Sequence, residues 1–383
     1  MKKLFLILIF SFPFFIYSQN LSFETKDSLN GKPKHKIVFG GFVNTIFNYD
    51  FVGLDSKYPA LNIASVPVGN HLKDPYMNFD AFQTRLRFNS SHQTKLGEVK
   101  LYVEGDFQSG TGAFRLRHAL ISVGRFDFGQ TWSNLADGDC WPNMTDYDGP
   151  PTGIWPRPTM IRYHIIKGKK HSLALSAEGP ILDYQVHINL DSVVSTSNQD
   201  VPDFILRYRF TTDKFHIQLG GVYRNIKYLN SLDSSFHYES GYGVAASGVF
   251  SLGRDKMYIQ YSIGKGISRY LVGYEGRQWD AVATGNHDIE LLPVQGGFFG
   301  FDHYWTKSKK FSSTVVLGYT NVVNDVFKNR DDFMLGYWGL VNLYWYPIDN
   351  MAVALEYAHA YRKNTWSKEG QAGRIQFLVQ YSF

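Results

Sequence analysis

The feature that most constrains this chain is a two-residue alternation of apolar and polar side chains, repeated in segments of about ten residues. The final segment places Ile375, Phe377 and Val379 on one face and Arg374 and Gln376 on the other. Because successive side chains of a β-strand point to opposite faces, the pattern predicts strands with one apolar and one polar face. Such strands need an apolar medium on one side and water on the other.

About sixteen alternating segments follow one another along the chain. They lie near residues 37–50, 80–91, 97–108, 113–124, 125–133, 158–167, 171–179, 203–212, 214–226, 240–252, 255–266, 292–304, 311–323, 333–346, 350–362 and 371–383. An even number is typical of bacterial membrane barrels, and sixteen strands leave an aqueous lumen.

A soluble sandwich also alternates, so the choice of a membrane barrel rests on further features. Tyr and Trp cluster at segment ends, as in Tyr304-Trp305 and Tyr344-Trp345-Tyr346, where interfacial girdles would require them. Tight turns such as Thr212-Asp213 alternate with long ones such as 268–291. Beyond the N-terminal residues no run of about 18 apolar residues predicts a membrane helix. The predicted fold class is therefore all-β, a transmembrane antiparallel β-barrel of about sixteen strands.

The first eighteen residues read as a secretory signal peptide, with Lys2-Lys3 before an apolar stretch and Ser18 before the expected cleavage site. Residues 19–36 read as a flexible periplasmic leader and 37–383 as the barrel. We expect the outer membrane of a Gram-negative bacterium, with its lipids and lipopolysaccharide around the wall. The last strand, ending at the aromatic Phe383, is the expected signal for the barrel-assembly machinery.

One stretch breaks the alternation. Residues 134–157 are rich in proline, glycine and aspartate and too irregular to pair as a strand. A long loop inside a barrel is usually functional, so we expect it to fold inward and set the constriction of the lumen. An extracellular loop lying over the rim remains the alternative. The residues expected at the constriction are Asp137, Asp139, Trp141, Asp146 and Asp148.

The Asp-x-Asp spacings of this loop could suit calcium, which takes oxygen ligands. The EF-hand pattern is absent, and acidic loops are common at porin mouths. We therefore predict no metal and no cofactor, and leave calcium binding open. Cys140 has no partner in the chain and is expected to be a small buried side chain.

Arginines recur on the polar faces of the predicted strands. Charges facing lipid would cost about 2–4 kcal/mol each at the midplane, so these side chains are assigned to the lumen. The predicted substrate pathway comprises Arg85, Arg87, Arg115, Arg117, Arg162, Arg207 and Arg209, and Arg224 and Arg374 share this orientation. Because a guanidinium binds carboxylates in bidentate fashion, the ladder favours anions. Pairing with lumenal acids such as Glu104 and Asp106 is the structural alternative.

Other functions have weaker support. The formal net charge of +5 is too small to indicate nucleic-acid binding. Histidines such as His118 and His164 lie in predicted strands, but no hydrolase or metalloprotease motif accompanies them, so we predict no enzyme. A binding or adhesion barrel, and less favourably a barrel hydrolase, are the alternatives to a pore.

Four motifs carry a resemblance to a known family. Phe114–Leu120, Gly129–Leu135, Asp146–Pro150 and Arg157–Tyr163 follow one another in an order that resembles the DcaP-like outer-membrane porins. The match is densest over residues 104–163. The resemblance implies a homotrimer of barrels that passes small anionic solutes, typically dicarboxylates, passively across the outer membrane.

Three observations accompany this resemblance. The expected leader is shorter than the N-terminal coiled coil of some relatives. The segment Gly138–Trp141 is unusual beside the loop of the family. Polar residues on otherwise lipid-like faces, such as His118 and Ser122, are expected to contribute to contacts between subunits.

Overall fold

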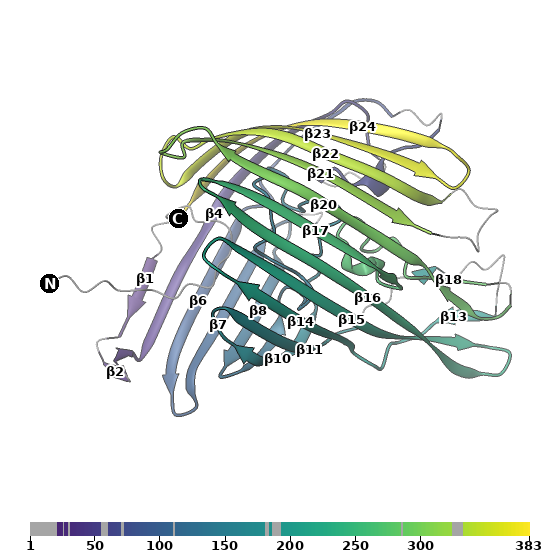
Figure 1. Cartoon of the computed structure of the whole chain (residues 1–383), viewed down its shortest axis with the longest axis horizontal. Helices are drawn as coiled ribbons and strands as arrows, with labels where there is room; N and C mark the ends of the chain where they lie inside the picture. The colour runs from purple at the N-terminus through teal and green to yellow at the C-terminus, as the bar shows by residue number, and fades with distance from the viewer. Residues whose placement is uncertain are drawn as a thin grey trace.

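The barrel wall is an antiparallel sheet of sixteen strand positions closed on itself (Figure 1). The computed structural model describes residues 21–383 except 26, 30, 55–59, 70–72, 110–111, 181–183, 186–192, 285 and 324–331. The predicted signal peptide lies outside the described residues. The count of sixteen confirms the predicted fold class, and each predicted segment overlaps a strand of the wall.

Sixteen strand positions, filled in chain order, form the wall. They are β4 (His35–Asp50), β5 (Tyr76–Asp80) with β6 (Arg85–Thr94), β7 (Gly97–Asp106), β8 (Arg115–Val123), β9 (Phe126–Gln130), β10 (Thr159–Lys167), β11 (His171–Glu178), β14 (Asp203–Thr211), β15 (Phe215–Asn230), β16 (Ser235–Leu252), β17 (Asp255–Lys265), β20 (Pro293–Tyr304), β21 (Phe311–Val322), β22 (Phe333–Trp345), β23 (Met351–Asn364) and β24 (Glu369–Ser382). β5 and β6 share one position, since both pair with β4 along different parts of its length. Closure comes from β24, which pairs with β4 in the register Ser382↔Phe42.

Shorter elements complete the chain. They are β1 (Leu21–Glu24), β2 (Ser28–Leu29), β3 (Lys32–Pro33), β12 (Tyr184–Gln185), β13 (Val194–Thr196), β18 (Ala281–Ala283), β19 (Ile289–Leu291) and the single-turn 3₁₀ helices η1 (Ile63–Ser65) and η2 (Ser268–Tyr270). Among the described residues, no helix is long and apolar enough to cross a membrane.

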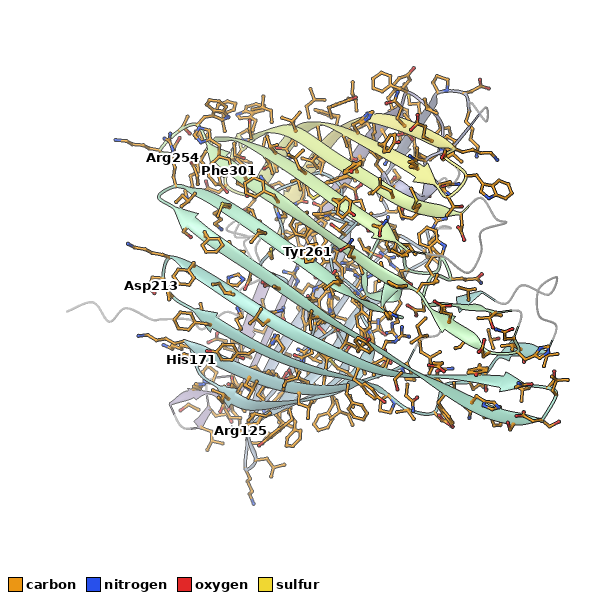
Figure 2. The ribbon with its side chains drawn as sticks, turned by 45° about the vertical axis from the view of Figure 1, so that its right-hand side comes forward. Arg125, His171, Asp213, Arg254, Tyr261 and Phe301 are labelled. Atoms are coloured by element: carbon orange, nitrogen blue, oxygen red, sulfur yellow. The ribbon has the colours of Figure 1, made fainter. Side chains whose placement is uncertain are left out.

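The wall buries its polar face and exposes its apolar face. In β22 the side chain of Asn342 is 4% exposed, whereas its neighbours Val341 and Leu343 are 49% and 50% exposed. Figure 2 shows Tyr261 on the wall between the two rims. This inversion of the usual protein interior is what lipid outside and polar groups inside require.

Every connection at one rim is short, and the long connections all lie at the other rim. Arg125, Asp213 and Arg254 lie in short turns on the same side of the barrel (Figure 2). In membrane barrels the short turns are periplasmic and the long loops extracellular. On the extracellular side β15 and β16 run far beyond their neighbours, a length that the predicted segments 214–226 and 240–252 did not include.

A β-bulge between β7 and β8 changes the predicted orientation of His118. The register shifts between Glu104 and Gly105, and as a result both Arg117 and His118 are turned into the barrel and buried. The His118 Nδ1 lies 3.0 Å from the Thr131 hydroxyl. His118 therefore does not lie on the lipid face, and the expectation that it contributes to subunit contacts was wrong.

Ser122 faces the interior as well. Its hydroxyl donates a hydrogen bond of 2.7 Å to Asp127, a buried carboxylate of β9. The two residues occupy paired positions of β8 and β9, so the bond joins adjacent strands on their inner face. Neither of the two polar residues chosen from the sequence lies on the outer surface.

The predicted flexible leader contains a strand. Residues Leu21–Glu24 form β1, which pairs with Lys36–Phe39 of β4, and the barrel strand β4 begins at His35. On its other side this part of β4 pairs with β6, so β1 occupies the side along which β24 has ended. The unpaired backbone groups of β4 there provide the physical reason for the added strand.

Candidate functional site

Residues 131–158 connect β9 to β10 and contact the inner faces of many wall strands. Gln218 of β15 donates to the carbonyl oxygen of Ala136 at 3.0 Å, and the backbone N–H of Thr145 donates to Glu356 of β23 at 2.9 Å. The hydroxyl of Tyr147 donates to Gln380 of β24. The segment thus contacts wall strands from β15 to β24, which line widely separated parts of the wall.

Local turns fold this segment back on itself. The N–H of Gly149 donates to the carbonyl oxygen of Asp146 at 3.2 Å, and the N–H of Gly153 donates to that of Pro150 at 2.7 Å. Gly149 has a φ of +74°, a left-handed conformation that favours glycine. Cys140 is fully buried, as expected, with its Sγ 3.3 Å from the carbonyl oxygen of Ile259.

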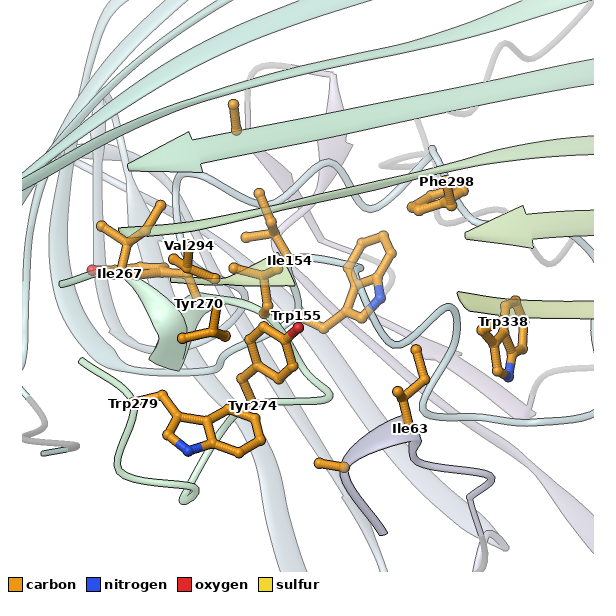
Figure 3. Close-up of a cluster of buried hydrophobic side chains, with 14 of the residues drawn as sticks. Ile63, Ile154, Trp155, Ile267, Tyr270, Tyr274, Trp279, Val294, Phe298 and Trp338 are labelled. Carbon is orange, nitrogen blue, oxygen red and sulfur yellow. The ribbon is translucent and has the colours of Figure 1, made fainter. Parts of the chain in front are cut away.

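Residues 266–291, between β17 and β20, pack against the long segment. The pair Ile154 and Leu271 forms an isolated antiparallel bridge, and Tyr270 and Tyr274 are almost fully buried. Figure 3 shows Tyr270, Tyr274 and Trp279 beside Ile154 and Trp155 in one hydrophobic cluster. Apolar burial therefore fixes the position of one connection relative to the other.

A third connection, between β4 and β5, reaches the same place. Its 3₁₀ helix η1 is buried, and the backbone N–H of Leu61 donates to the Asp146 carboxylate at 3.0 Å. Arg362 of β23 donates to the carbonyl oxygen of Ala64. Residues of three connections and of the wall therefore meet within the barrel.

A cavity of about 260 Å³ lies where these segments meet. Residues 131–158 contribute three tryptophans and an arginine to its lining. Residues 266–291 contribute one acidic and one basic side chain, and the wall contributes Arg115. The lining residues are Asn62, Ser65, Arg115, Trp132, Trp141, Tyr147, Asp148, Trp155, Arg157, Val272, Glu275 and Arg277. This cavity is the candidate functional site.

The tryptophans form one side of the cavity. The ring centroids of Trp141 and Trp155 are 4.4 Å apart, and Trp132 lies 6.0 Å from Trp155. The guanidinium of Arg157 lies 4.6 Å from the Trp132 ring centroid, within cation–π range. The rings hold this arginine in place without neutralising its charge.

Most of the predicted pathway arginines near the cavity are paired with acids. Glu104 lies 2.8 Å from Arg87, 3.2 Å from Arg117 and 3.6 Å from Arg85. Asp106 accepts hydrogen bonds of 2.8 Å from Arg115 and 2.9 Å from Arg117. Four arginines thus share two carboxylates on β7, so this patch keeps an excess of positive charge.

Arg157 differs from these four, because no ion pair joins it to a described residue. Burial lowers the pKa of Arg157 to about 9, and the guanidinium groups of Arg117 and Arg115 contribute to the decrease. The side chain is still protonated at neutral pH. An anion in the cavity would relieve the repulsion between these cations.

The other predicted pathway arginines lie closer to the short turns. Arg162 of β10 donates to the carbonyl oxygen of Trp132 at 2.7 Å. Arg209 of β14 pairs with Asp137 at 3.3 Å and also with Asp139. Arg207 lies 3.5 Å from the Ser172 hydroxyl. Arg224 and Arg374 point inward as predicted, each in ion pairs with buried aspartates.

The predicted acidic residues of the loop separate into two groups. Asp137, Asp139 and His216 bring ligand atoms within 4.8 Å of one another, and a cation could in principle meet them there. Arg209 pairs with both aspartates, so a positive charge already occupies that position. Asp146 instead contacts Leu61, and Asp148 lines the cavity. The two Asp-x-Asp pairs do not form one joint site.

Burial raises the pKa of Asp146, and the neighbouring Asp148 carboxylate contributes to the increase. The pKa of Asp148 is also raised by burial, although Arg115 and Arg157 oppose the change. Among the described parts of the cavity, the charge of Asp148 therefore responds to pH closer to neutrality than that of an ordinary aspartate.

Several cavity residues were not predicted from the sequence. They are Asn62, Ser65, Trp132, Trp155, Arg157, Glu275 and Arg277. Arg157 had a usable signal, since it stands between Pro156 and Pro158 in a stretch without alternation. Glu275 and Arg277 lie in a connection that looked like an ordinary long turn, and only their long-range contacts bring them to the site.

Comparisons with known proteins agree with this architecture. A sequence model described as the DcaP outer membrane protein matches residues 15–383. The outer membrane channel DcaP of Acinetobacter baumannii has a similar structure, with a TM-score of 0.77 and 21% identity over 91% of this chain and 97% of that chain. None of the curated proteins searched matches this chain.

Two further porin structures are similar at the level of the fold. An anion-selective porin from Comamonas acidovorans has a TM-score of 0.58 and 9% identity, covering 91% of this chain and all of that chain. OmpT of Vibrio cholerae in its trimer form has a TM-score of 0.55 and 11% identity, covering 91% of this chain and 99% of that chain. These likenesses show a porin barrel.

Proposed function

We propose, from the premise that this chain belongs to the DcaP outer membrane protein family, that it passes small organic anions through the cavity between its inward-facing connections. The protein is an outer-membrane porin of a Gram-negative bacterium. The anion preference and the class of solute are the proposed part of this function.

The observation that carries the proposal is Arg157. A half-buried guanidinium with no carboxylate partner among the described residues is costly, and its neighbours Arg115 and Arg117 increase that cost. The cavity is lined by this side chain, Arg115 and Arg277 from three separate segments. An anion entering between them supplies the missing negative charge at this place.

Dicarboxylates and similar organic anions suit this arrangement. Guanidinium groups that approach from several sides can bind two carboxylates at once, each in bidentate fashion. Asp148 and Glu275 also line the cavity, and their negative charge keeps the total attraction moderate. A moderate attraction allows the solute to leave, which conduction requires.

Residues 134–157 are proposed to set the constriction, and Asp137, Asp139, Trp141, Asp146 and Asp148 to help shape it. The support is the series of contacts that the segment makes with the inner face of the wall. The pathway is proposed to pass Arg85, Arg87, Arg115 and Arg117 on one side. It then continues to Arg162, Arg207 and Arg209 near the periplasmic end.

The reversal potential of the channel in a planar bilayer under a KCl gradient tests the anion preference. We expect a chloride-selective wild type, and loss or reversal of the preference in Arg157→Glu. The double variant Arg115→Glu/Arg162→Glu should act in the same direction. Lys309→Glu makes the same charge change in an exposed periplasmic turn and should leave selectivity unchanged. A cation-selective wild type would refute the proposal. In that case the dicarboxylate succinate would not be expected to block the channel.

The assembly is proposed to be a homotrimer surrounded by outer-membrane lipids and lipopolysaccharide. The trimer form of a porin with the same fold supports this state, and the exposed apolar wall provides the surface for lipid and subunit contacts. β24, ending at Phe383, is proposed to engage the barrel-assembly machinery. A monomeric mass in mild detergent would contradict the trimer.

A further inference from the structure

A second group of arginines lies below the long segment, toward the short turns. Arg162 on β10 and Arg207 on β14 both face the interior, because their strand neighbours Ile161, Leu206 and Tyr208 are exposed on the outer surface. Arg207 is four residues from Thr211, where β14 ends at a short turn. Neither arginine lines the cavity described above.

Arg162 and Arg207 lie on either side of one intervening strand, β11. Arg162 is paired with Ser176 of β11, and Arg207 is paired with Ala174 of the same strand. Two strand spacings across and two residues along place their α-carbons roughly 12 Å apart. Ser172, Ala174 and Ser176 of β11, the strand between them, have small side chains.

The charges of this pair are poorly compensated. The nearest carboxylate to Arg162 is Asp127, at 3.8 Å, and no described carboxylate lies within ion-pair distance of Arg207. The Nε atoms of both arginines are buried and have no hydrogen-bond acceptor among the described residues. Arg207 is also repelled by Arg162 and Arg209.

The surrounding acids are engaged elsewhere. Asp127 lies 2.9 Å from His164 and accepts from Ser122, and Glu178 accepts from the backbone N–H of Asn134 and from Ser176. Farther along the wall, Asp137 is bound by His216, Ser247 and Arg209, and Asp139 by Arg209. None of these side chains can move to Arg207 without leaving its own partners.

We infer that Arg162, Arg207 and the Ser172 hydroxyl form a second binding position for an oxyanion, on the periplasmic side of the long segment. It would bind a single carboxylate, or a sulfate or phosphate group of similar shape, through two guanidinium groups and one hydroxyl. An anion that leaves the upper cavity would reach this position before the periplasm. The inference rests on the proposed function, to which it adds a second, separate step.

Sulfate block of single channels tests this position, because sulfate is divalent at every working pH. Sulfate is added to one chamber at a time, and the concentration that halves the chloride current is measured. Streptavidin binding to a biotin on Arg254→Cys, in a short turn, reports which chamber faces the periplasmic rim. Cys140 is buried and does not compete for the label.

In Arg207→Gln we expect the half-blocking concentration from the periplasmic side to rise about tenfold, as expected for losing one charge-assisted contact. The block from the extracellular side, where sulfate meets the upper cavity first, should stay close to wild type. Lys214→Gln removes the same charge from the adjacent exposed turn and should change neither block. Arg207→Lys should retain part of the periplasmic block.

The experiment separates failure of the second binding position from failure of the proposed function. Unchanged periplasmic block in a folded, anion-selective Arg207→Gln channel would overturn the second position and leave the proposed function standing. A cation-selective wild type would instead overturn the proposed function. Heat-modifiable migration in gels establishes that each variant has folded before its currents are compared.

Discussion

Two arginine-rich regions line the interior, and they differ in how their charge is balanced. On β6 to β8, four arginines surround Glu104 and Asp106 in a dense ion-pair network. In the cavity, Arg157 lies against Trp132 and has no ion-pair partner among the residues that the structure describes. The first region joins neighbouring strands through ion pairs, while the second keeps a charge that no described carboxylate balances.

The difference teaches that a lumenal arginine is not by itself an anion site. A guanidinium already bound in bidentate fashion to a carboxylate has few donors left, as with Arg115 on Asp106. What attracts a mobile anion is the charge left after such pairing. Variants in the two regions test this division of roles.

Removing the acid at the centre of the network should be most damaging. In Glu104→Gln three arginines lose their shared carboxylate in a buried position, which should cost about 3–5 kcal/mol of unfolding free energy. Urea-induced unfolding of protein refolded into lipid vesicles measures the loss. Glu98→Gln, whose pairs with Lys32 and Lys100 are partly exposed, should cost at most about 1 kcal/mol. Equal losses in the two variants would contradict the structural role of the network.

Deleting residues 138–150 should raise single-channel conductance, because the deletion removes much of the segment that contacts the inner wall and lines the cavity. Planar-bilayer recording measures the change. Deletion of 231–234, at the tip of the β15–β16 hairpin, is the matched control and should leave conductance unaltered. If the first deletion has no effect, the segment does not limit the current.

Arg157→Gln and Arg117→Gln separate the two regions most directly. Arg117→Gln breaks charged hydrogen bonds to Glu104 and Asp106 and should destabilise the barrel by about 1.5–3 kcal/mol. Arg157→Gln removes a charge with no ion-pair partner in the described part of the chain, so it should leave the unfolding free energy nearly unchanged and lower the chloride preference. Urea unfolding and reversal potentials on both variants provide the comparison. A large loss of stability in Arg157→Gln would show that Arg157 holds the barrel together, as the arginines of the ion-pair network do.

The smallest expected effect is a change of selectivity with pH. Because burial raises the pKa of Asp148, this carboxylate gains a proton on acidification before an ordinary aspartate does. Losing that negative charge makes the cavity more positive, so chloride preference should increase on acidification. Asp148→Asn should show the increased preference already at neutral pH and little change over this range. A chloride preference that decreases on acidification in the wild type would contradict this prediction.

The wall could be predicted from the sequence because each strand there obeys a local rule. In β22 the residue type alone shows which way each side chain points. The apolar Val341 and Leu343 face the lipid, and the polar Asn342 between them faces the interior. The rule fails at the bulge, where Arg117 and His118 are adjacent in sequence and both point inward. It also misses the ends of β15 and β16, which continue past the predicted boundaries at 226 and 240.

The cavity could be predicted only in part. The unusual composition of residues 134–157 marked that segment as functional, and Asp148 and Trp141 do line the cavity. The contribution of residues 266–291 depends on packing such as Ile154 against Leu271, which joins parts of the chain more than a hundred residues apart. The distinction between paired and unpaired arginines depends equally on such contacts, so the sequence alone could not separate Arg157 from Arg115.

The way β1 follows β24 along β4 has a topological consequence. Phe383 exchanges two backbone hydrogen bonds with Gly41, and Leu21 pairs with Phe39 (Figure 1). β24 and β1 therefore follow one another along β4 in the same direction, separated by one chain break. A short linker from Phe383 to Leu21 would join them. A circular permutant with its new termini at residues 231–234 would keep the same neighbours for every wall strand. Its strands would be synthesised in a different order, so its folding would show whether the barrel depends on that order.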